Sequence, residues 1–213
     1  MHKFVENIFF DLDGTLIDSK QRLYQLFTDL SGQTTLNFEE YWGCKRAKQT
    51  NQAILKNMLH FSDERVTKFS STWMRLIEDE KYLAMDTLFS DTISSLECLK
   101  TFAHLYVVTA RQFEQKAIIQ LTHLGIESYF KKILVTEQKQ SKTDLIRTVN
   151  TPALYSLIIG DTGEETNTGK ELNMITVSVL TGFRNKEVLQ TYKPDYIFND
   201  LTDFSTAVRQ FLI

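Results

Sequence analysis

The chain is poor in cysteine, proline and glycine: its 213 residues include only 2 Cys, 2 Pro and 8 Gly. Cys44 and Cys98 lie far apart and form no Cys-x-x-Cys pair, so we expect both thiols to be reduced, as in a reducing compartment. So few prolines and glycines leave no segment with the composition of a linker or a low-complexity tract. The sequence therefore predicts a folded chain without a disulfide framework.

Long apolar runs and blocks of one charge are also missing. No run approaches the roughly 18 apolar residues that a membrane-spanning helix requires. The first ten residues lack the apolar core and cleavage site of a signal peptide. Lys and Arg total 24 against 27 Asp and Glu, a formal net charge of −3, and no basic block exceeds two residues. These features argue against nucleic acid or a membrane as partner and predict a cytoplasmic protein, while a small anionic ligand needs only one local positive site.

Short apolar runs rich in β-branched residues alternate with amphipathic helical patterns over most of the chain. The expected strands are Asn7–Phe10, Leu105–Thr109, Lys132–Val135, Ser156–Ile159, Ile175–Val179 and Tyr196–Phe198. The expected helices between them are Thr92–Phe102, Arg111–Leu124, Ser141–Val149, Glu164–Leu172, Asn185–Tyr192 and Leu201–Phe211. This order predicts an α/β fold whose core is a doubly wound, mainly parallel, Rossmann-like sheet.

One region departs from this alternation. From about residue 18 to residue 85 we find only helical periodicity, with three apolar stripes and no convincing strand. Ser31-Gly32 is expected to end the first of these helices and Asp63 to cap the third. We therefore predict an inserted all-helical cap domain over residues 17–85, and an α/β catalytic core formed by residues 1–16 and 86–213.

The first expected strand runs directly into two acidic residues. The segment is Asp11-Leu12-Asp13-Gly14-Thr15, after an apolar run. In open α/β sheets, ligands bind at the carboxyl ends of the strands. Two neighbouring carboxylates are tolerated there only with a cation or a shared proton. A polar turn that merely ends the strand is the simpler alternative, but the pattern favours a functional site.

Three further strand or helix ends carry complementary groups. Thr109 ends one strand, Lys142 lies at the start of a helix, and Asp161 follows another strand. A lysine in a first helical turn opposes the helix dipole, which an anionic neighbour would explain. Taken singly, Thr109 is better explained as a helix cap and Lys142 as a solvated side chain. Asp161-Thr162-Gly163 matches the triplet of aspartic proteases, but those are all-β proteins and this segment has a βαβ context.

Together these groups suit the transfer of a phosphoryl group. Asp11, Asp13 and Asp161 offer hard oxygen ligands, which Mg²⁺ prefers. Thr109 and Lys142 offer a hydrogen bond and a positive charge to a phosphoryl oxygen. A carboxylate can attack phosphorus and form an aspartyl phosphate, provided that a cation screens the repulsion between the two anions.

The four motifs, in this order over essentially the whole chain, resemble those of the haloacid dehalogenase-like hydrolases. In particular, the chain resembles their phosphatases with a small helical (C1-type) cap, such as phosphoglycolate phosphatases and β-phosphoglucomutases. It implies that Asp11 is the nucleophile and Asp13 the general acid and base. It also implies that Thr109, Ala110 and Lys142 hold the phosphoryl group. Dehalogenase members lack the second acid of the first motif, so Asp13 indicates phosphate-ester chemistry.

The same resemblance implies a Mg²⁺ site. Its ligands would be Asp11, the main-chain carbonyl of Asp13, and Asp161, supported by the acid four residues after Asp161. That acid is Glu165 here, whereas the family usually has aspartate, and the longer side chain would act through a bridging water or reposition the metal. Glu164 is a neighbouring alternative for this supporting role.

Two further segments bear on the substrate. Arg111 follows the Thr109-Ala110 motif, where the family usually has Asn or Gly, and either contacts phosphate or caps a carboxylate. Residues 41–46 resemble the substrate-specificity loop of the family's cap, a glycine turn followed by polar residues. We expect Lys45 and Arg46 to bind a second anionic group of the substrate, the alternative being a solvated basic face.

The sequence thus predicts a Mg²⁺-dependent phosphomonoester hydrolase, monomeric or homodimeric. Its substrate would be a small phosphorylated metabolite, such as phosphoglycolate or a sugar phosphate, cleaved through an aspartyl phosphate. A phosphomutase of the same fold is one alternative, and a catalytically idle binding protein is another, for which Glu165 is the only reason. A phospho-accepting signalling switch also clusters acids with Thr and Lys, but such modules are shorter and have no cap.

Overall fold

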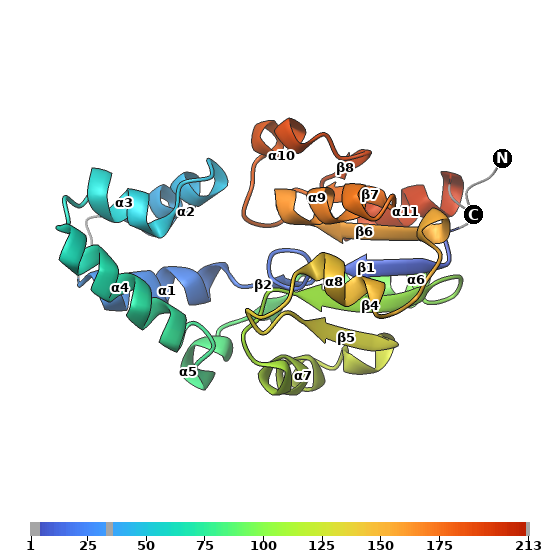
Figure 1. Ribbon diagram of the computed structural model, residues 1–213, viewed down its shortest axis with the longest axis horizontal. Coiled ribbons are helices and arrows are strands. Elements are labelled where there is room, and N and C mark those ends of the chain that lie inside the picture. Colours follow the sequence, from blue (N-terminus) through green and yellow to red (C-terminus); the bar gives the residue numbers. More distant parts are fainter. Residues whose placement is uncertain (1–4, 33–35, 212–213) are drawn as a thin grey trace.

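The computed structural model describes residues 5–32 and 36–211, and its elements follow the predicted alternation (Figure 1). The strands are β1 (Asn7–Phe10), β2 (Ile17–Asp18), β3 (Thr87–Leu88), β4 (His104–Thr109), β5 (Lys132–Val135), β6 (Ser156–Gly160), β7 (Ile175–Val179) and β8 (Tyr196–Phe198). The helices are α1 (Lys20–Ser31), α2 (Phe38–Arg46), α3 (Asn51–Asn57), α4 (Asp63–Leu76), α5 (Glu80–Leu83), α6 (Thr92–Leu99), α7 (Glu114–His123), α8 (Lys142–Arg147), α9 (Gly163–Glu171), α10 (Lys186–Tyr192) and α11 (Leu201–Phe211), with 3₁₀ turns at Glu127–Tyr129 and Ala153–Tyr155.

The large sheet is parallel throughout, with strand order β5-β4-β1-β6-β7-β8. β1 lies inside it, and Phe10 is aligned with Val107 of β4 and Ile159 of β6. The chain winds outward from β1 in both directions, so the loops after β1, β4 and β6 meet at one edge of the sheet. The predicted doubly wound, Rossmann-like α/β fold is confirmed.

β1 shows why the core strands are apolar at every position. Ile8 and Phe10 pack into the cluster that includes the apolar faces of α6, α7 and α11. Phe9 points to the opposite face, where its ring stacks on Tyr106 at 4.6 Å in the cluster that includes α8. Helices therefore cover both faces of the sheet (Figure 1). Burying a side chain such as Phe9 or Phe10 contributes about 1.5–3 kcal/mol to stability. This burial holds β1 in place, and with it the residues that directly follow β1.

Helices α1 to α5 follow one another between β2 and β3 and lie together at one end of the molecule, on the left in Figure 1. They have an apolar cluster of their own, in which Phe27, Tyr41 and Ile54 are fully buried. Phe183, from the loop after β7, also packs against this cluster, and its ring lies 5.4 Å from that of Trp42. The helical block is thereby held beside the carboxyl edge of the large sheet.

Among the described residues, no helix has the length and apolar character needed to cross a bilayer.

Several local details differ from the sequence predictions. The block is bounded by a two-residue antiparallel ribbon, in which Ile17 pairs with Leu88; strands this short leave no pattern to detect. α1 ends at Ser31-Gly32 as predicted, where Gly32 has a φ of 68°. The N-cap of α4 is Ser62 rather than Asp63, because Ser62 has extended backbone angles and its hydroxyl accepts from Arg65 N.

The prediction of a glycine turn within residues 41–46 was wrong. These residues form the last two thirds of α2. Asn37 and Glu40 form a capping box at the start of this helix, with both reciprocal hydrogen bonds present. Gly43 is exposed within the helix, and a Cβ there would meet nothing within 4 Å. A well-capped helix therefore runs through the glycine. Cys44 and Cys98 are free thiols, as predicted.

Candidate active site

The end of β1 places the first two acids. Asp11 continues the sheet pairing through its N–H, which donates to Ile159 O at 2.9 Å. The chain then turns at Gly14, whose φ of +88° favours glycine, and a Cβ there would lie 2.5 Å from Asp161 Oδ2. The glycine thus lets the β1 loop pack directly on the loop after β6. This close approach brings the acids of the two loops together.

A cavity of about 390 Å³ opens at this edge of the sheet. The residues of the core that were predicted for the site and lie in its wall are Asp11, Asp13, Thr109, Ala110, Lys142 and Glu165. The opposite wall comes from the helical block and includes Met74, Ile77 and Glu78. The structure therefore brings together groups from four separate segments of the core and closes them on one side with the end of α4.

The ammonium of Lys142 is surrounded by carboxylates in this cavity. Lys142 is the first residue of α8, which Ser141 caps, and only 2% of its side chain is exposed. Its ammonium lies 2.6 Å from Asp11 Oδ1 and also pairs with the carboxylate of Glu165. Burial would lower the pKa of Lys142, but these two carboxylates outweigh it and raise the pKa well above its usual value. Burial raises the pKa of Asp11 to about 7, although Lys142 opposes that shift.

Glu165 and Glu164 occupy different surroundings. Glu165 is 1% exposed, and both of its oxygens are engaged: one accepts from Lys142 Nζ and the other from Thr162 Oγ1 at 2.7 Å. Glu164 is half exposed and lies 3.4 Å from the same ammonium. Burial would raise the pKa of Glu165, but Lys142 outweighs it and lowers the pKa. Glu165 is thus a buried counter-charge of Lys142, whereas Glu164 lies at the rim.

Asp161 lies behind the cavity wall. It has no exposed surface, and its Oδ2 accepts from the main-chain N–H of Phe183. Its Oδ1 is buried and has no hydrogen-bond partner among the described residues. Burial, together with the charges of Asp11 and Glu165, raises the pKa of Asp161 well above its usual value. An anionic oxygen in such a place requires a cation or a proton.

Two observations bear on a metal ion at this site. Across residues 5–32 and 36–211, no three His, Cys, Asp or Glu side chains are arranged as a ready metal site, since Asp11 and Glu165 converge on Lys142 instead. The donor chemistry still fits a divalent cation, because Asp161 Oδ1 is buried without a partner among the described residues and the charge of Asp11 raises the pKa of Asp161. Asp11, Asp161 and the main-chain carbonyl of Asp13 are the residues that would hold it.

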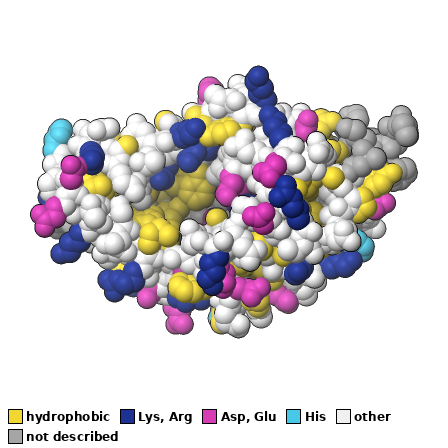
Figure 2. Space-filling view, viewed as in Figure 1, with side chains coloured by type: hydrophobic (Ala, Val, Ile, Leu, Met, Phe, Trp, Pro, Cys, Tyr) yellow, Lys and Arg dark blue, Asp and Glu magenta, His cyan; other side chains and the backbone are white. Residues whose placement is uncertain are grey.

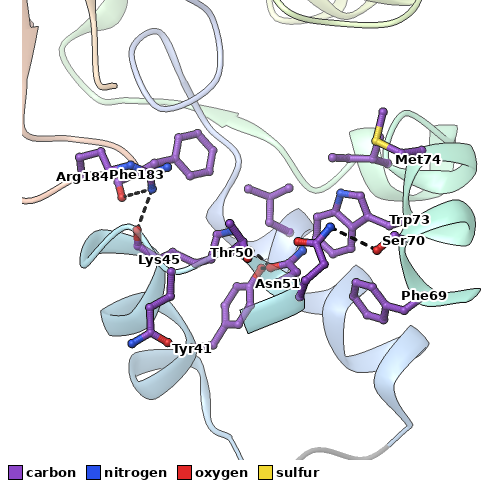
Figure 3. A pocket seen from close by; sticks show the side chains of 14 residues that line it. Tyr41, Lys45, Thr50, Asn51, Phe69, Ser70, Trp73, Met74, Phe183 and Arg184 are labelled. Atoms are coloured by element: carbon purple, nitrogen blue, oxygen red, sulfur yellow. Dashed lines mark hydrogen bonds between the residues drawn. The ribbon is translucent and has the colours of Figure 1, made fainter. Parts of the chain in front are cut away.

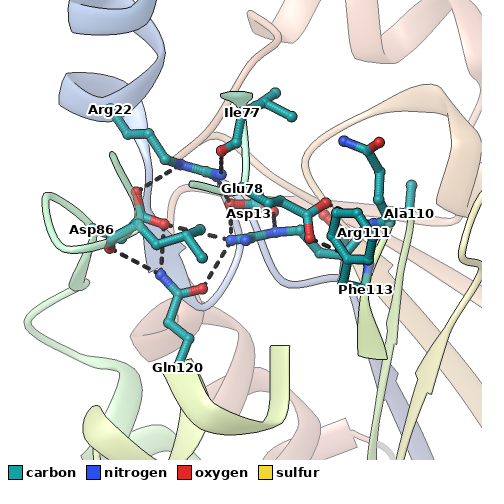
Figure 4. A network of polar contacts seen from close by, with 12 residues as sticks. Asp13, Arg22, Ile77, Glu78, Asp86, Ala110, Arg111, Phe113 and Gln120 are labelled. Carbon is teal, nitrogen blue, oxygen red and sulfur yellow. Dashed lines mark hydrogen bonds and ion pairs between the residues drawn. The ribbon is translucent and has the colours of Figure 1, made fainter. Parts of the chain in front are cut away.

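Asp13 is held by two arginines (Figure 4). Arg111 makes a bidentate pair, with Nε 2.6 Å from Oδ2 and Nη2 2.8 Å from Oδ1, and Arg22 contacts the same carboxylate. Burial would raise the pKa of Asp13, but the two guanidinium groups outweigh it and hold the pKa at about 2. Of the two alternatives for Arg111, the structure shows the contact with a carboxylate.

Arg22 was not predicted from the sequence. It comes from α1, is 2% exposed, and also pairs with Asp86 through Nε at 2.9 Å and donates to Ile77 O at 2.9 Å. Gln120 of α7 donates to the other oxygen of Asp86 at 2.8 Å. One signal for Arg22 was available: it stands one turn before Leu26, in the apolar stripe of α1.

Glu78 was missed as well. Its carboxylate accepts from the main-chain N–H groups of Gln112 and Phe113 at 2.6 and 3.3 Å, at the start of α7. Lys116 Nζ donates to the Glu78 carbonyl at 2.7 Å. Glu78 therefore ties the end of α4 to the loop that carries Arg111. Glu78 begins the acidic run of residues 78–80 after α4, and nothing in that run indicates which of its carboxylates makes this contact.

The remaining predicted residues lie around this centre. Thr109 ends β4 and is 2% exposed, and the Ala110 carbonyl accepts from Gln138 Nε2 at 2.8 Å. Lys45 lines a neighbouring cavity of about 380 Å³. Arg46 lines neither of the two cavities, and its carbonyl accepts from Asn185 N at 3.2 Å.

The chain is a parallel α/β sheet with an inserted helical block and a cavity lined by acids at the carboxyl edge of the sheet. Open α/β sheets bind their ligands at this edge. The sequence model described as haloacid dehalogenase-like hydrolase matches residues 8–179, and the chain belongs to this family. The predicted family is confirmed.

Relatives and solved structures agree with this assignment. The chain is 23% identical over 211 residues to a protein named pyrophosphatase PpaX from Oceanobacillus iheyensis, covering 96% of this chain and 97% of that one. It is 26% identical to a phosphoglycolate phosphatase from Aquifex aeolicus, covering 92% and 93%. Its fold matches a haloacid dehalogenase-like hydrolase from Streptococcus pneumoniae with a TM-score of 0.80 at 24% identity, covering 95% and 98%.

Proposed function

We propose that this chain hydrolyses phosphomonoesters of small metabolites through an aspartyl phosphate formed on Asp11, with Mg²⁺ as cofactor. The observation that carries the proposal is the cavity in which Asp11, Lys142 and Thr109 meet at one edge of the sheet. A carboxylate able to attack and a buried ammonium able to hold phosphoryl oxygens are the two groups that this chemistry requires. The names of two relatives support the transfer of a phosphoryl group to water: phosphoglycolate phosphatase denotes a phosphomonoester substrate, and pyrophosphatase denotes a phosphoanhydride.

The reaction has two steps. In the first, an oxygen of Asp11 attacks phosphorus, the bond from phosphorus to the leaving oxygen breaks, and the aspartyl phosphate forms. Lys142 Nζ, 2.6 Å from Asp11 Oδ1, places a positive charge beside the incoming phosphoryl oxygens. In the second, water attacks the phosphorus of the intermediate and Asp13 accepts its proton. Phosphate then leaves and the Asp11 carboxylate is regenerated.

Asp13 serves both steps, and its ion pairs bear on each. The deprotonated carboxylate held by Arg111 and Arg22 is the form that accepts a proton from water. To protonate the leaving oxygen in the first step, Asp13 must first loosen these pairs and take up a proton from solvent; it regains that proton from water in the second step. Both arginines line the cavity, so an anionic substrate competes with Asp13 for them.

Asp11, Asp161 and the Asp13 carbonyl are the proposed ligands of Mg²⁺. The bound ion would screen the repulsion between Asp11 and the phosphate it attacks. Because both oxygens of Glu165 are engaged, we assign it the role of orienting Lys142 rather than direct ligation. Residues 17–85 are proposed to act as a cap domain on the core of residues 1–16 and 86–213, since Met74, Ile77 and Glu78 form the wall facing the acids.

The experiment is phosphate release from a panel of esters, measured with Mg²⁺ and with EDTA. The esters are phosphoglycolate, sugar phosphates, nucleoside monophosphates and phenyl phosphate, and pyrophosphate, a phosphoanhydride, is tested beside them. We expect release that depends on Mg²⁺ and is lost in Asp11→Asn. Release that survives Asp11→Asn would refute the assigned nucleophile. If no ester releases phosphate but a sugar phosphate is isomerised, the chain is a phosphomutase of the same fold.

A further inference from the structure

A second cavity, of about 380 Å³, lies between the helical block and the loop after β7 (Figure 3). Its wall shares Leu23, Met74, Ile77 and Phe183 with the catalytic cavity, so the two cavities adjoin along these apolar side chains. Figure 2 shows a hollow with hydrophobic walls between the helical block and the core, with Lys and Arg side chains beside it. A molecule bound at the acids can therefore extend into this second space.

The charge in the second cavity is of one sign. Lys45 and Arg184 line it, and no Asp or Glu is among the described residues of its wall. Lys45 Nζ has a neutral partner, Asn51 Oδ1 at 3.2 Å, and Arg184 Nη1 donates to the carbonyls of Lys45 and Phe183 at 2.7 and 3.0 Å. Neither cation is paired with a carboxylate within the part of the chain that the structure describes. Two neighbouring cations without a counter-charge attract an anion.

The rest of the wall consists of aromatic and apolar side chains and of five neutral polar ones, Gln49, Thr50, Asn51, Gln52 and Ser70, of which the last four already hydrogen-bond within the helical block. Tyr41, Phe69, Trp73 and Phe183 contribute rings to it, and the rings of Phe69 and Trp73 are stacked at 5.6 Å. Such rings bind a flat or apolar body, because they remove its surface from water. The polar groups of the cavity that carry charge are confined to Lys45 and Arg184.

We propose that the second cavity binds the leaving group of the substrate, and that this leaving group is an apolar or aromatic body ending in a second anionic group held by Lys45 and Arg184. The inference rests on the proposed function, because it takes the phosphoryl end of the substrate to lie at Asp11. It adds a residue of the core, Arg184, to the lysine expected from the sequence. The substrate class is a phosphomonoester with one anion at each end.

The test compares two esters that differ in one charge. They are 4-carboxyphenyl phosphate and 4-carbamoylphenyl phosphate, each also tested with a biphenyl in place of the phenyl ring. In at least one of the two pairs, phenyl or biphenyl, we expect kcat/KM of the carboxylate ester to exceed that of the amide ester by about tenfold or more, as for a charge-assisted contact. Lys45→Met and Arg184→Gln should raise KM for that ester about tenfold and leave kcat nearly unchanged. The matched control is Lys68→Ala, an exposed lysine of α4 that lines neither cavity.

A binding measurement keeps the inference separate from catalysis. The probes are 4-(phosphonomethyl)benzoate and benzylphosphonate, with their biphenyl homologues, titrated calorimetrically into the wild type and the three variants. Tighter binding of the carboxylate probe, lost in Lys45→Met and in Arg184→Gln but kept in Lys68→Ala, supports the inference even if no ester is hydrolysed. Equal Kd values for both probes in the wild type overturn it. Turnover of both esters with equal kcat/KM, unchanged in both variants, overturns it while the proposed phosphatase activity stands.

Discussion

Lys142 Nζ lies 2.6 Å from Asp11 Oδ1, and only 2% of the Lys142 side chain and 10% of the Asp11 side chain are exposed. The two residues are 131 positions apart in the sequence, and their meeting depends on α8 starting at the edge where β1 ends. The ion pair places the positive charge that a phosphate requires directly beside the carboxylate that would attack it. It also means that changes at Lys142 and at Asp11 affect stability and activity differently.

Asp11→Asn is expected to abolish phosphate release, by about 10³-fold or more, because an amide is a poor nucleophile. The midpoint of thermal unfolding should change by only a few degrees. The substitution removes one charge from a cluster in which burial has already raised the pKa of Asp11 to about 7. Phosphate release and thermal unfolding are measured on the same preparations. Asp18→Asn, an acid of β2 outside the cavity wall, is the control and should keep full activity.

Lys142→Met is expected to lower the free energy of unfolding by about 3–5 kcal/mol, because it leaves Asp11 and Glu165 buried without a counter-charge. Adding Glu165→Gln to Lys142→Met should recover part of this loss, since one of the two stranded charges is then gone. Urea denaturation of the two single variants and the double variant gives the coupling between the sites. Additive effects would contradict a direct dependence of these residues on each other.

Mg²⁺ is expected to raise the midpoint of thermal unfolding, by an amount equivalent to about 2.7 kcal/mol at about 100 times its Kd. In Asp161→Asn this shift should largely vanish. Without metal, the variant should be at least as stable as the wild type, since the substitution replaces a buried carboxylate whose Oδ1 has no partner. Asp63→Asn, an exposed acid of α4, is the control. An equal shift in Asp161→Asn would refute its role as a ligand.

The parallel core could be predicted from the sequence because its signals are local. The strands β1, β5, β7 and β8 have the predicted bounds, since a strand buried on both faces is apolar at every position. The acids at the end of β1 could be predicted for a related reason: all strands of a parallel sheet end at the same edge, so residues that directly follow the strands meet there. Residue 43 misled the prediction because a glycine indicates a turn only when no stronger signal opposes it. The capping box of Asn37 and Glu40 does oppose it.

The polar network around Asp13 could not be predicted in this way. Periodicity indicates which side of α1 is buried, but it does not indicate what Arg22 meets there, which is Asp13 of the β1 loop and Asp86 beyond α5. Likewise Arg184 contacts the carbonyl of Lys45 across 139 positions of sequence. Such pairs depend on how the helical block docks on the core, and that docking leaves no local pattern in either segment.

The preference for an anionic leaving group is expected to depend on pH through Lys45. Burial and the nearby Arg184 lower the pKa of Lys45 from its ordinary value of 10.5 to about 8. The charged form is therefore present at pH 7 and is lost as the pH rises toward 9, so the ratio of kcat/KM for 4-carboxyphenyl to 4-carbamoylphenyl phosphate should fall with a midpoint near pH 8. Taking this ratio removes the effect of any enzyme group, or of the phosphate of the ester, whose titration changes kcat/KM equally for both esters.

Two variants separate Lys45 from the other groups that face it, which are the Arg184 guanidinium, the Cys44 thiol and the hydroxyl of Tyr41. A guanidinium stays protonated throughout this range, so Lys45→Arg should keep the preference for the carboxylate ester and make it constant from pH 7 to about pH 9. Cys44→Ser should leave the midpoint unchanged. A ratio that still falls near pH 8 in Lys45→Arg would assign the titration to another group. A ratio that is flat in the wild type would mean that Lys45 does not contact the leaving group, because a bound anion must sense the loss of its charge.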